Sequence, residues 1–241
     1  MKLSVIIPAY NEAKCIRGCL GSVFEALAAH PRGDLATEVI VVDNNSTDGT
    51  GDLARTAGAR VVFEPVNQIA RARNAGAAAA TGAWFLFLDA DSLLPPATLG
   101  EILDRIESGE YAGGGTVIAF DNAPFWAKIA LAAGNFIFRL SKITPGCMIF
   151  CRVDAFRAIG GFNEELFAAE DAVFGRELWR WGKRRGLRTI ILHKHPPVTS
   201  SRKLYLYTKA EMLALLLRFF LAPKATLRDR RGLQIFYDGR R

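Results

Sequence analysis

The stretch Phe85-Leu86-Phe87-Leu88-Asp89-Ala90-Asp91-Ser92 places two carboxylates two residues apart, directly after an apolar run. The apolar residues 84–88 predict a buried strand of the type found in parallel sheets. Asp89 and Asp91 then stand at the carboxyl end of that strand, where open α/β sheets bind ligands. Two anions held this close favour a nearby cation, and a hard divalent ion with few protein ligands leaves positions for diphosphate oxygens. The alternative is that the pair caps the following segment, because Asp-Ser before Leu-Leu-Pro-Pro also suits the start of a helix.

The first ninety residues alternate apolar runs with amphipathic segments. The pattern predicts strands at 2–8, 38–43, 60–64 and 84–89, and helices at 12–29, 47–58 and 68–81. Strict alternation of this kind implies parallel strands with helices on both faces of the sheet. We therefore predict an α/β fold with a doubly wound, mostly parallel central sheet.

Composition limits the possible classes of protein. The 241 residues are 50% apolar, which suits one large domain, alone or with a tail, and the net charge is +7. This charge fits nucleic acid, anionic lipid or a nucleotide-linked substrate, but no RNA-binding or helix-turn-helix signature accompanies it, so we expect no nucleic-acid partner. The apolar run 3–8 is too short for a secretory signal, which predicts a cytoplasmic protein.

Four cysteines occur as two pairs, each four residues apart: Cys15 with Cys19, and Cys147 with Cys151. The spacing allows a zinc site, but no histidine is interleaved with the pairs. In a reducing compartment we expect small buried hydrophobic residues and no disulfide.

Two further loops should reach the same sheet edge as Asp89. Residues 8–12 follow the first predicted strand and residues 43–50 follow the second. Their polar residues can serve as helix caps. Asp43, however, directly ends its strand, where a carboxylate can bind a base or ribose hydroxyls. The Gly-x-Gly-x-x-Gly and Gly-Lys-Ser/Thr phosphate loops are both absent, which argues against dehydrogenase and P-loop chemistry.

A resemblance to a known family rests on several motifs in order. They are Val5 to Glu12 (Val-Ile-Ile-Pro-Ala-Tyr-Asn-Glu), Val41 to Thr50 (Val-Val-Asp-Asn-Asn-Ser-Thr-Asp-Gly-Thr), Ala72 to Gly76 (Ala-Arg-Asn-Ala-Gly), Leu88 to Asp91 (Leu-Asp-Ala-Asp), Gly160 to Asn163 (Gly-Gly-Phe-Asn) and Ala169 to Asp171 (Ala-Glu-Asp). Together they resemble the family-2 glycosyltransferases, which have a GT-A fold, and the likeness covers about residues 1–190. It implies a GT-A domain at 1–203, with a nucleotide-binding half at 1–91 and an acceptor-binding half at 92–203. A C-terminal helical tail at 204–241 would follow.

The resemblance also implies roles for single residues. Pro8, Tyr10, Glu12, Asp43, Arg73, Asp89, Ala90 and Arg202 would bind the nucleotide of a UDP- or GDP-linked sugar donor. Asp91, Asp89 and His195 would hold a divalent metal, Mg²⁺ or Mn²⁺. Asp171 would deprotonate the acceptor hydroxyl of a glycan or lipid, with Glu170 as polar support or as the alternative base, and the reaction would invert the anomeric centre.

Local sequence leaves alternatives to several of these roles. Glu170 and Asp171 precede an amphipathic helix, so they can simply cap it. His195 and Arg202 lie in segments that match the family pattern poorly, and each can be a surface residue. Two other functions stay open: a nucleotidyltransferase that forms sugar nucleotides, and a nucleotide-binding protein without catalytic activity.

Two apolar segments suggest contact with a membrane surface. Residues 122–141 are apolar but interrupted by charges, so we expect an interfacial or acceptor-covering helix rather than a spanning one. Residues 210–222 form a short apolar stretch flanked by basic residues. Such a helix can lie on anionic lipid at the inner face of the cell membrane, or it can pack against the catalytic domain or a second subunit.

Overall fold

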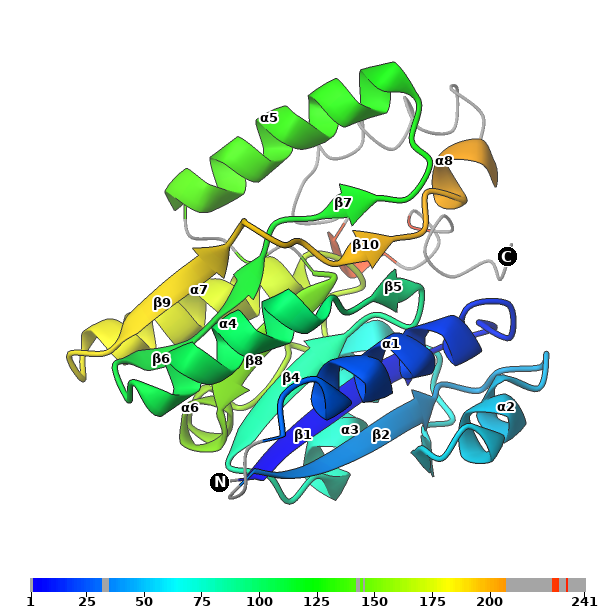
Figure 1. Ribbon diagram of the computed structural model, residues 1–241, viewed down its shortest axis with the longest axis horizontal. Coiled ribbons are helices and arrows are strands. Elements are labelled where there is room, and N and C mark those ends of the chain that lie inside the picture. Colours follow the sequence, from blue (N-terminus) through cyan, green and yellow to red (C-terminus); the bar gives the residue numbers. More distant parts are fainter. Residues whose placement is uncertain are drawn as a thin grey trace.

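The computed structural model describes residues 2–31, 35–141, 144, 146–206, 227–229 and 233. Within them a seven-stranded sheet has the order β3-β2-β1-β4-β8-β6-β9 (Figure 1). Its strands are β1 (Lys2–Ala9), β2 (Ala36–Asp43), β3 (Arg60–Phe63), β4 (Trp84–Leu88), β6 (Tyr111–Thr116), β8 (Met148–Arg152) and β9 (Arg188–Leu192). Only β8 runs antiparallel to its neighbours. The prediction of a mostly parallel α/β sheet is confirmed.

Helices cover both faces of this sheet because side chains alternate along each strand. Val5 and Ile7 of β1 lie in the core on one face, and Ile6 lies in the core on the other. The first face carries α1 (Ile16–Ala28), α2 (Thr50–Thr56) and α4 (Pro96–Glu107). The second carries α3 (Ile69–Ala79), α6 (Val153–Ile159) and α7 (Glu170–Lys183). All five residues of β4 are buried, as its apolar sequence predicted.

A second, three-stranded sheet was not predicted. It consists of β5 (Ser92–Leu93), β10 (Val198–Thr199) and β7 (Ala119–Phe120), in that order. The Ser200 amide also donates to the Asp91 carbonyl at 3.0 Å. This sheet therefore carries the chain around residue 200 to the acidic end of β4. Helices α5 (Phe125–Ser141) and α8 (Lys203–Leu206) lie beyond it (Figure 1).

The remaining expectations have mixed outcomes. The helix expected from residue 12 begins at Ile16, because turns precede it and Asn11 has a left-handed backbone, φ 53°. The four thiols are free; three are buried, and Cys15 is half-buried. The stretch 210–222 lies outside the described residues, and the domain boundaries stay a prediction. No helix in the described part of the chain has the length and apolar character needed to cross a membrane.

Candidate active site

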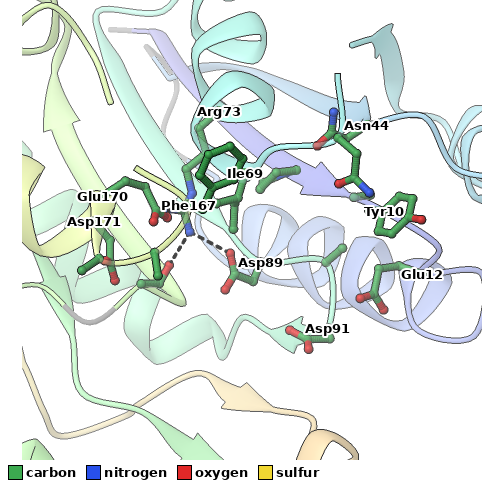
Figure 2. A pocket seen from close by; sticks show the side chains of 17 residues that line it. Tyr10, Glu12, Asn44, Ile69, Arg73, Asp89, Asp91, Phe167, Glu170 and Asp171 are labelled. Carbon is green, nitrogen blue, oxygen red and sulfur yellow. Dashed lines mark hydrogen bonds and ion pairs between the residues drawn. The ribbon is translucent and has the colours of Figure 1, made fainter. Parts of the chain in front are cut away.

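A cavity of about 320 Å³ lies at the carboxyl ends of β1 and β4. Segments from both halves of the chain form its walls (Figure 2). The predicted site residues among its lining are Pro8, Tyr10, Glu12, Arg73, Asp89, Ala90, Asp91, Glu170 and Asp171. The structure therefore gathers residues more than 160 positions apart around one space.

Asp89 and Asp91 follow directly after β4. The Asp89 amide donates to the Cys147 carbonyl at 3.0 Å, and the Ser92 amide donates back to the Asp89 carbonyl at 3.0 Å. This tight turn directs the chain from the large sheet into β5. Both aspartates line the cavity, and Figure 2 shows them between the Glu170 side and the Glu12 side.

Arg73 of α3 is a buried cation that joins the two acidic segments. Its side chain is 1% exposed; Nη1 donates to Glu170 Oε1 at 2.6 Å and Nη2 donates to Asp89 Oδ1 at 3.0 Å. Nη2 also donates to the Gly146 carbonyl at 2.8 Å. Burial alone would lower the pKa of Arg73, but the surrounding carboxylates raise it above its ordinary value. Arg73 therefore stays charged and fixes Asp89 relative to Glu170.

Asn74, next to Arg73, connects the segment Gly160-Gly161-Phe162 to the site through hydrogen bonds to the Phe162 backbone. Asn74 Nδ2 donates to the Phe162 carbonyl at 2.9 Å, and the Phe162 amide donates to Asn74 Oδ1 at 2.9 Å. The Phe162 ring also lies 5.2 Å from the Arg73 guanidinium carbon. Arg73 and Asn74 thus anchor the loop that leads to Glu170.

Glu170 and Asp171 begin α7. Asp171 Oδ1 accepts from the Ala172 amide at 2.8 Å, at the positive end of the helix. Burial raises the pKa of Glu170 to about 7, against the opposing charge of Arg73. Burial also raises the pKa of Asp171 above its usual range, again opposed by Arg73. Such carboxyls accept a proton more readily than exposed ones.

Gly146 leaves room for the Asp171 carboxylate. A Cβ at position 146 would lie 2.5 Å from Asp171 Oδ2, well inside van der Waals contact. The residue before α7, Ala169, has a left-handed backbone with φ 60°, which is uncommon for a residue other than glycine. Strained backbone of this kind gathers at functional sites.

The opposite wall contains Tyr10 and Glu12, from the loop after β1. The Glu12 amide donates to Thr50 Oγ1 at 2.8 Å, so this loop is tied to the start of α2. Arg202 donates from Nη2 to Glu12 Oε2, and the same nitrogen lies 3.9 Å from Asp91 Oδ2. Arg202 does not itself line the cavity, but it lies beside two residues that do.

Two predicted residues lie elsewhere. Asp43 Oδ1 accepts from the Ser46 amide at 3.0 Å and its carboxylate packs against Gly51, so it caps its own loop and does not line the cavity. His195 faces Glu101 of α4, with Nε2 3.9 Å from Oε1, and is also outside the lining. The geometry gives no support to His195 as a metal ligand, and base binding by Asp43 stays a prediction.

Sequence reasoning missed several residues of the lining. They are Ala9, Asn44, Asn67, Ile69, Phe167, Ala168 and Ala169. Asn44 is buried and links segments, because its Oδ1 accepts from the Gln68 amide at 2.8 Å. Asn44 could have been found from the sequence, because it directly follows the candidate residue Asp43. Phe167 carried none, because the contact that holds it is distant: its amide donates to the Leu227 carbonyl at 2.7 Å.

The residues present suit a hard divalent cation. The described part of the chain contains no cluster of three or more His, Cys, Asp or Glu residues arranged for a metal. The two aspartates at the cavity supply oxygen ligands, and Mg²⁺ and similar ions bind through one or two carboxylates while phosphates and water complete the shell. The donor set therefore fits an ion that is shared with a bound diphosphate.

Solved structures resemble this chain over almost its whole length. A mannosyltransferase from Pyrobaculum calidifontis in complex with GDP-Man and Mn²⁺ has a TM-score of 0.65 at 22% identity, covering 98% of this chain and 73% of that chain. Glucosyl-3-phosphoglycerate synthase from Mycobacterium tuberculosis, in complex with Mn²⁺, UDP and glucosyl-3-phosphoglycerate, has a TM-score of 0.62 at 20% identity, covering 94% and 80%. At such identities the likeness establishes the fold, and the predicted GT-A type is confirmed.

Sequence comparison gives the family. A dolichol-phosphate mannosyltransferase of Pyrococcus furiosus is 31% identical over 144 residues, which are 54% of this chain and 38% of that protein. An uncharacterised glycosyltransferase of Mycoplasma pneumoniae is 26% identical over 202 residues, 74% of this chain and 65% of that protein. The chain thus spans less than two thirds of either relative. The model described as glycosyl transferase family 2 matches residues 4–160, well over half of the chain, and this protein belongs to that family.

Proposed function

We propose that this chain is an inverting glycosyltransferase that moves a sugar from a nucleoside diphosphate donor to an acceptor hydroxyl. The observation that carries the proposal is the convergence of Asp89 and Asp91 with Asp171 on one cavity. Arg73 bridges the two acidic segments and sets their separation. Donor binding and proton removal then take place at opposite ends of the same space.

The donor end comprises the loop after β1 and the two aspartates. Pro8, Tyr10 and Glu12, which line the cavity, would border the nucleoside, and Asp89 and Asp91 would hold a divalent ion, Mg²⁺ or Mn²⁺. An ion held there would supply positive charge next to the departing diphosphate. Arg202, held beside Glu12 and Asp91, adds a cation near the same phosphates. The mannosyltransferase of similar fold was solved with GDP-Man and Mn²⁺, which supports a nucleotide sugar and a divalent ion as the ligand classes.

Asp171 is the general base at the acceptor end. Its carboxylate takes the proton of the acceptor hydroxyl while the hydroxyl oxygen bonds to the anomeric carbon. The bond from that carbon to the diphosphate breaks on the opposite face, so the products are an inverted glycoside and the free nucleoside diphosphate. Glu170 is committed to Arg73 at 2.6 Å and acts as structural support. The acceptor in this proposal is a glycan or a lipid-linked hydroxyl. The proposed location is the cytoplasm, at or near the inner face of the cell membrane.

A thermal-shift screen tests this function. UDP-, GDP- and dTDP-sugars are added with and without Mn²⁺ or Mg²⁺, because a ligand that binds the native state raises the unfolding midpoint. At a hundredfold excess over the dissociation constant the gain is about 2.7 kcal/mol. We expect one donor class to raise the midpoint with metal only, and Asp91→Asn to abolish that shift. A screen in which no nucleotide sugar stabilises the wild-type protein would contradict the proposal.

A further inference from the structure

Helix α5 carries an apolar stripe that points away from the rest of the molecule. Phe125 is 79% exposed, Ile129 56% and Phe136 60%. At about 100° per residue these three positions fall within an arc of roughly 40° on the helix. Large apolar side chains gathered in this way on a surface mark a contact with another body.

The sides of α5 that face the fold fix this orientation, because Ala127 lies opposite the stripe and Asn135 lies about 100° from its centre. Ala127 is buried, and Asn135 is bound twice to one residue: Nδ2 donates to the Ile118 carbonyl at 2.8 Å, and the Ile118 amide donates to Oδ1 at 3.1 Å. In Figure 1, α5 lies at the edge of the molecule with β7 and β10 on its inner side. The stripe is therefore held outward by the fold.

Helix α8 extends the apolar surface. Tyr205 is 64% exposed, and its hydroxyl donates to the Asn122 carbonyl at 2.8 Å, next to the start of α5. Among the described residues, four of the eight large exposed hydrophobic side chains lie on α5 and α8. Large exposed hydrophobic side chains are therefore concentrated on these two helices rather than spread evenly over the described surface.

The charge of α5 and of the chain segment after α8 indicates what kind of surface the stripe contacts. Helix α5 (Phe125–Ser141) contains no acidic residue, whereas Lys128 and Arg139 are basic. Lys128 is exposed on α5 beside the apolar stripe. The chain segment 207–226 is itself net positive, with three basic residues and one acidic residue, so its charge does not complement α5. An anionic surface complements both segments.

We propose that the outer face of α5 docks onto an anionic lipid surface. Phe125, Ile129 and Phe136 enter the boundary between headgroups and acyl chains, where aromatic side chains are favoured, while Lys128 meets the phosphates. The helix lies in the plane of the surface. This inference does not depend on the proposed reaction, because it rests on residues outside the cavity.

Vesicle flotation of the full chain tests the proposal without any donor or acceptor. We expect binding to vesicles of phosphatidylcholine with phosphatidylglycerol, and much weaker binding to phosphatidylcholine alone. The triple variant Phe125→Ser, Ile129→Ser, Phe136→Ser should lose more than about tenfold in partition constant. The matched control Phe63→Ser, at an equally exposed phenylalanine (59%) on β3, should float like the wild type.

A second variant keeps the test independent of folding. Lys128→Glu leaves the apolar stripe intact but reverses one charge, so it should weaken binding to anionic vesicles. This loss should exceed the loss that added salt causes in the wild type. The proposal is overturned if the wild type does not float, if it binds neutral vesicles equally well, or if the triple variant floats unchanged. It is also overturned if sedimentation velocity shows a dimer that the triple variant abolishes, because the stripe would then bind a second copy.

Discussion

The two sides of the candidate active site are held in different ways. On the donor side the loops after β1 and β2 hydrogen-bond to each other. The Asn11 amide donates to Ser46 Oγ at 3.0 Å, and the Thr47 amide donates to Asn11 Oδ1 at 2.8 Å. Both loops belong to the regular β-α part of the chain, so neighbouring segments position this side.

The acceptor side depends on contacts from distant parts of the chain. Gln68 Nε2 donates to the carbonyls of Glu164 at 2.6 Å and Leu166 at 3.0 Å, and Phe167 is bound to Leu227. Arg73 completes the connection by binding Glu170. The loops after β1 and β2 are thus positioned by neighbouring β-α segments, whereas Asp171 follows a loop that is held by Gln68 and Arg73 from the first half of the chain.

The variant Asp171→Asn should separate the functions of the two sides most clearly, because it should affect catalysis without affecting donor binding. The amide cannot take the acceptor proton, so kcat should fall by about 10²- to 10⁴-fold. Donor binding in the thermal-shift assay should stay unchanged, because the donor loops do not rely on Asp171. The matched control is Glu177→Gln, further along α7, where the carboxylate pairs with Arg180 at the surface.

Equal loss of activity and of donor binding in Asp171→Asn would contradict this separation. It would mean that Asp171 supports the cavity as a whole rather than the proton transfer alone.

Arg73→Met should have the largest effect on stability, because Arg73 joins the two sides. It leaves Glu170 and Asp89 without their buried cation, and breaking a buried pair in this way costs about 3–5 kcal/mol in free energy of unfolding. Arg55→Met is the control: Arg55 pairs with Asp52 at the surface at 2.6 Å, and such exposed pairs contribute about 0–1 kcal/mol. Urea unfolding measures both. Similar losses in the two variants would refute the bridging role.

Locally encoded features of the fold and the site could be predicted from the sequence, whereas contacts between distant segments could not. The run 84–88 and the alternation before it predicted the sheet, and the acids that end β4 were placed at the correct edge because strand ends are encoded locally. The contact of Phe167 with Leu227 and the small sheet of β5, β7 and β10 were not predictable. They pair short segments with no periodicity of their own, far apart in sequence. The metal role of His195 came from the family resemblance, and the position of its ring beside Glu101 gives that prediction no support.

Gly146→Ala should perturb the acceptor side alone. The new Cβ would lie 2.5 Å from Asp171 Oδ2, so the carboxylate must move. Misplacement of a catalytic group by about 1 Å can cost roughly 10²-fold in rate, so we expect kcat to fall by about tenfold to a hundredfold. Donor binding should be retained. The matched control is Gly21→Ala in α1, where a Cβ meets nothing within 4 Å. Unchanged kcat in Gly146→Ala would show that Asp171 tolerates displacement.

The pH dependence of kcat should show the smallest effect, confined to the acid range. Burial raises the pKa of Asp171 above its usual value, and the same cause raises the pKa of Glu170 to about 7. The base must be ionised to accept a proton, so activity should be full above this raised pKa. It should fall about tenfold per unit as pH drops below it. An acid limb near pH 4, where exposed carboxylates titrate, would mean that the charge of Arg73 offsets the effect of burial on the base. Burial could then not be what tunes Asp171 for proton transfer.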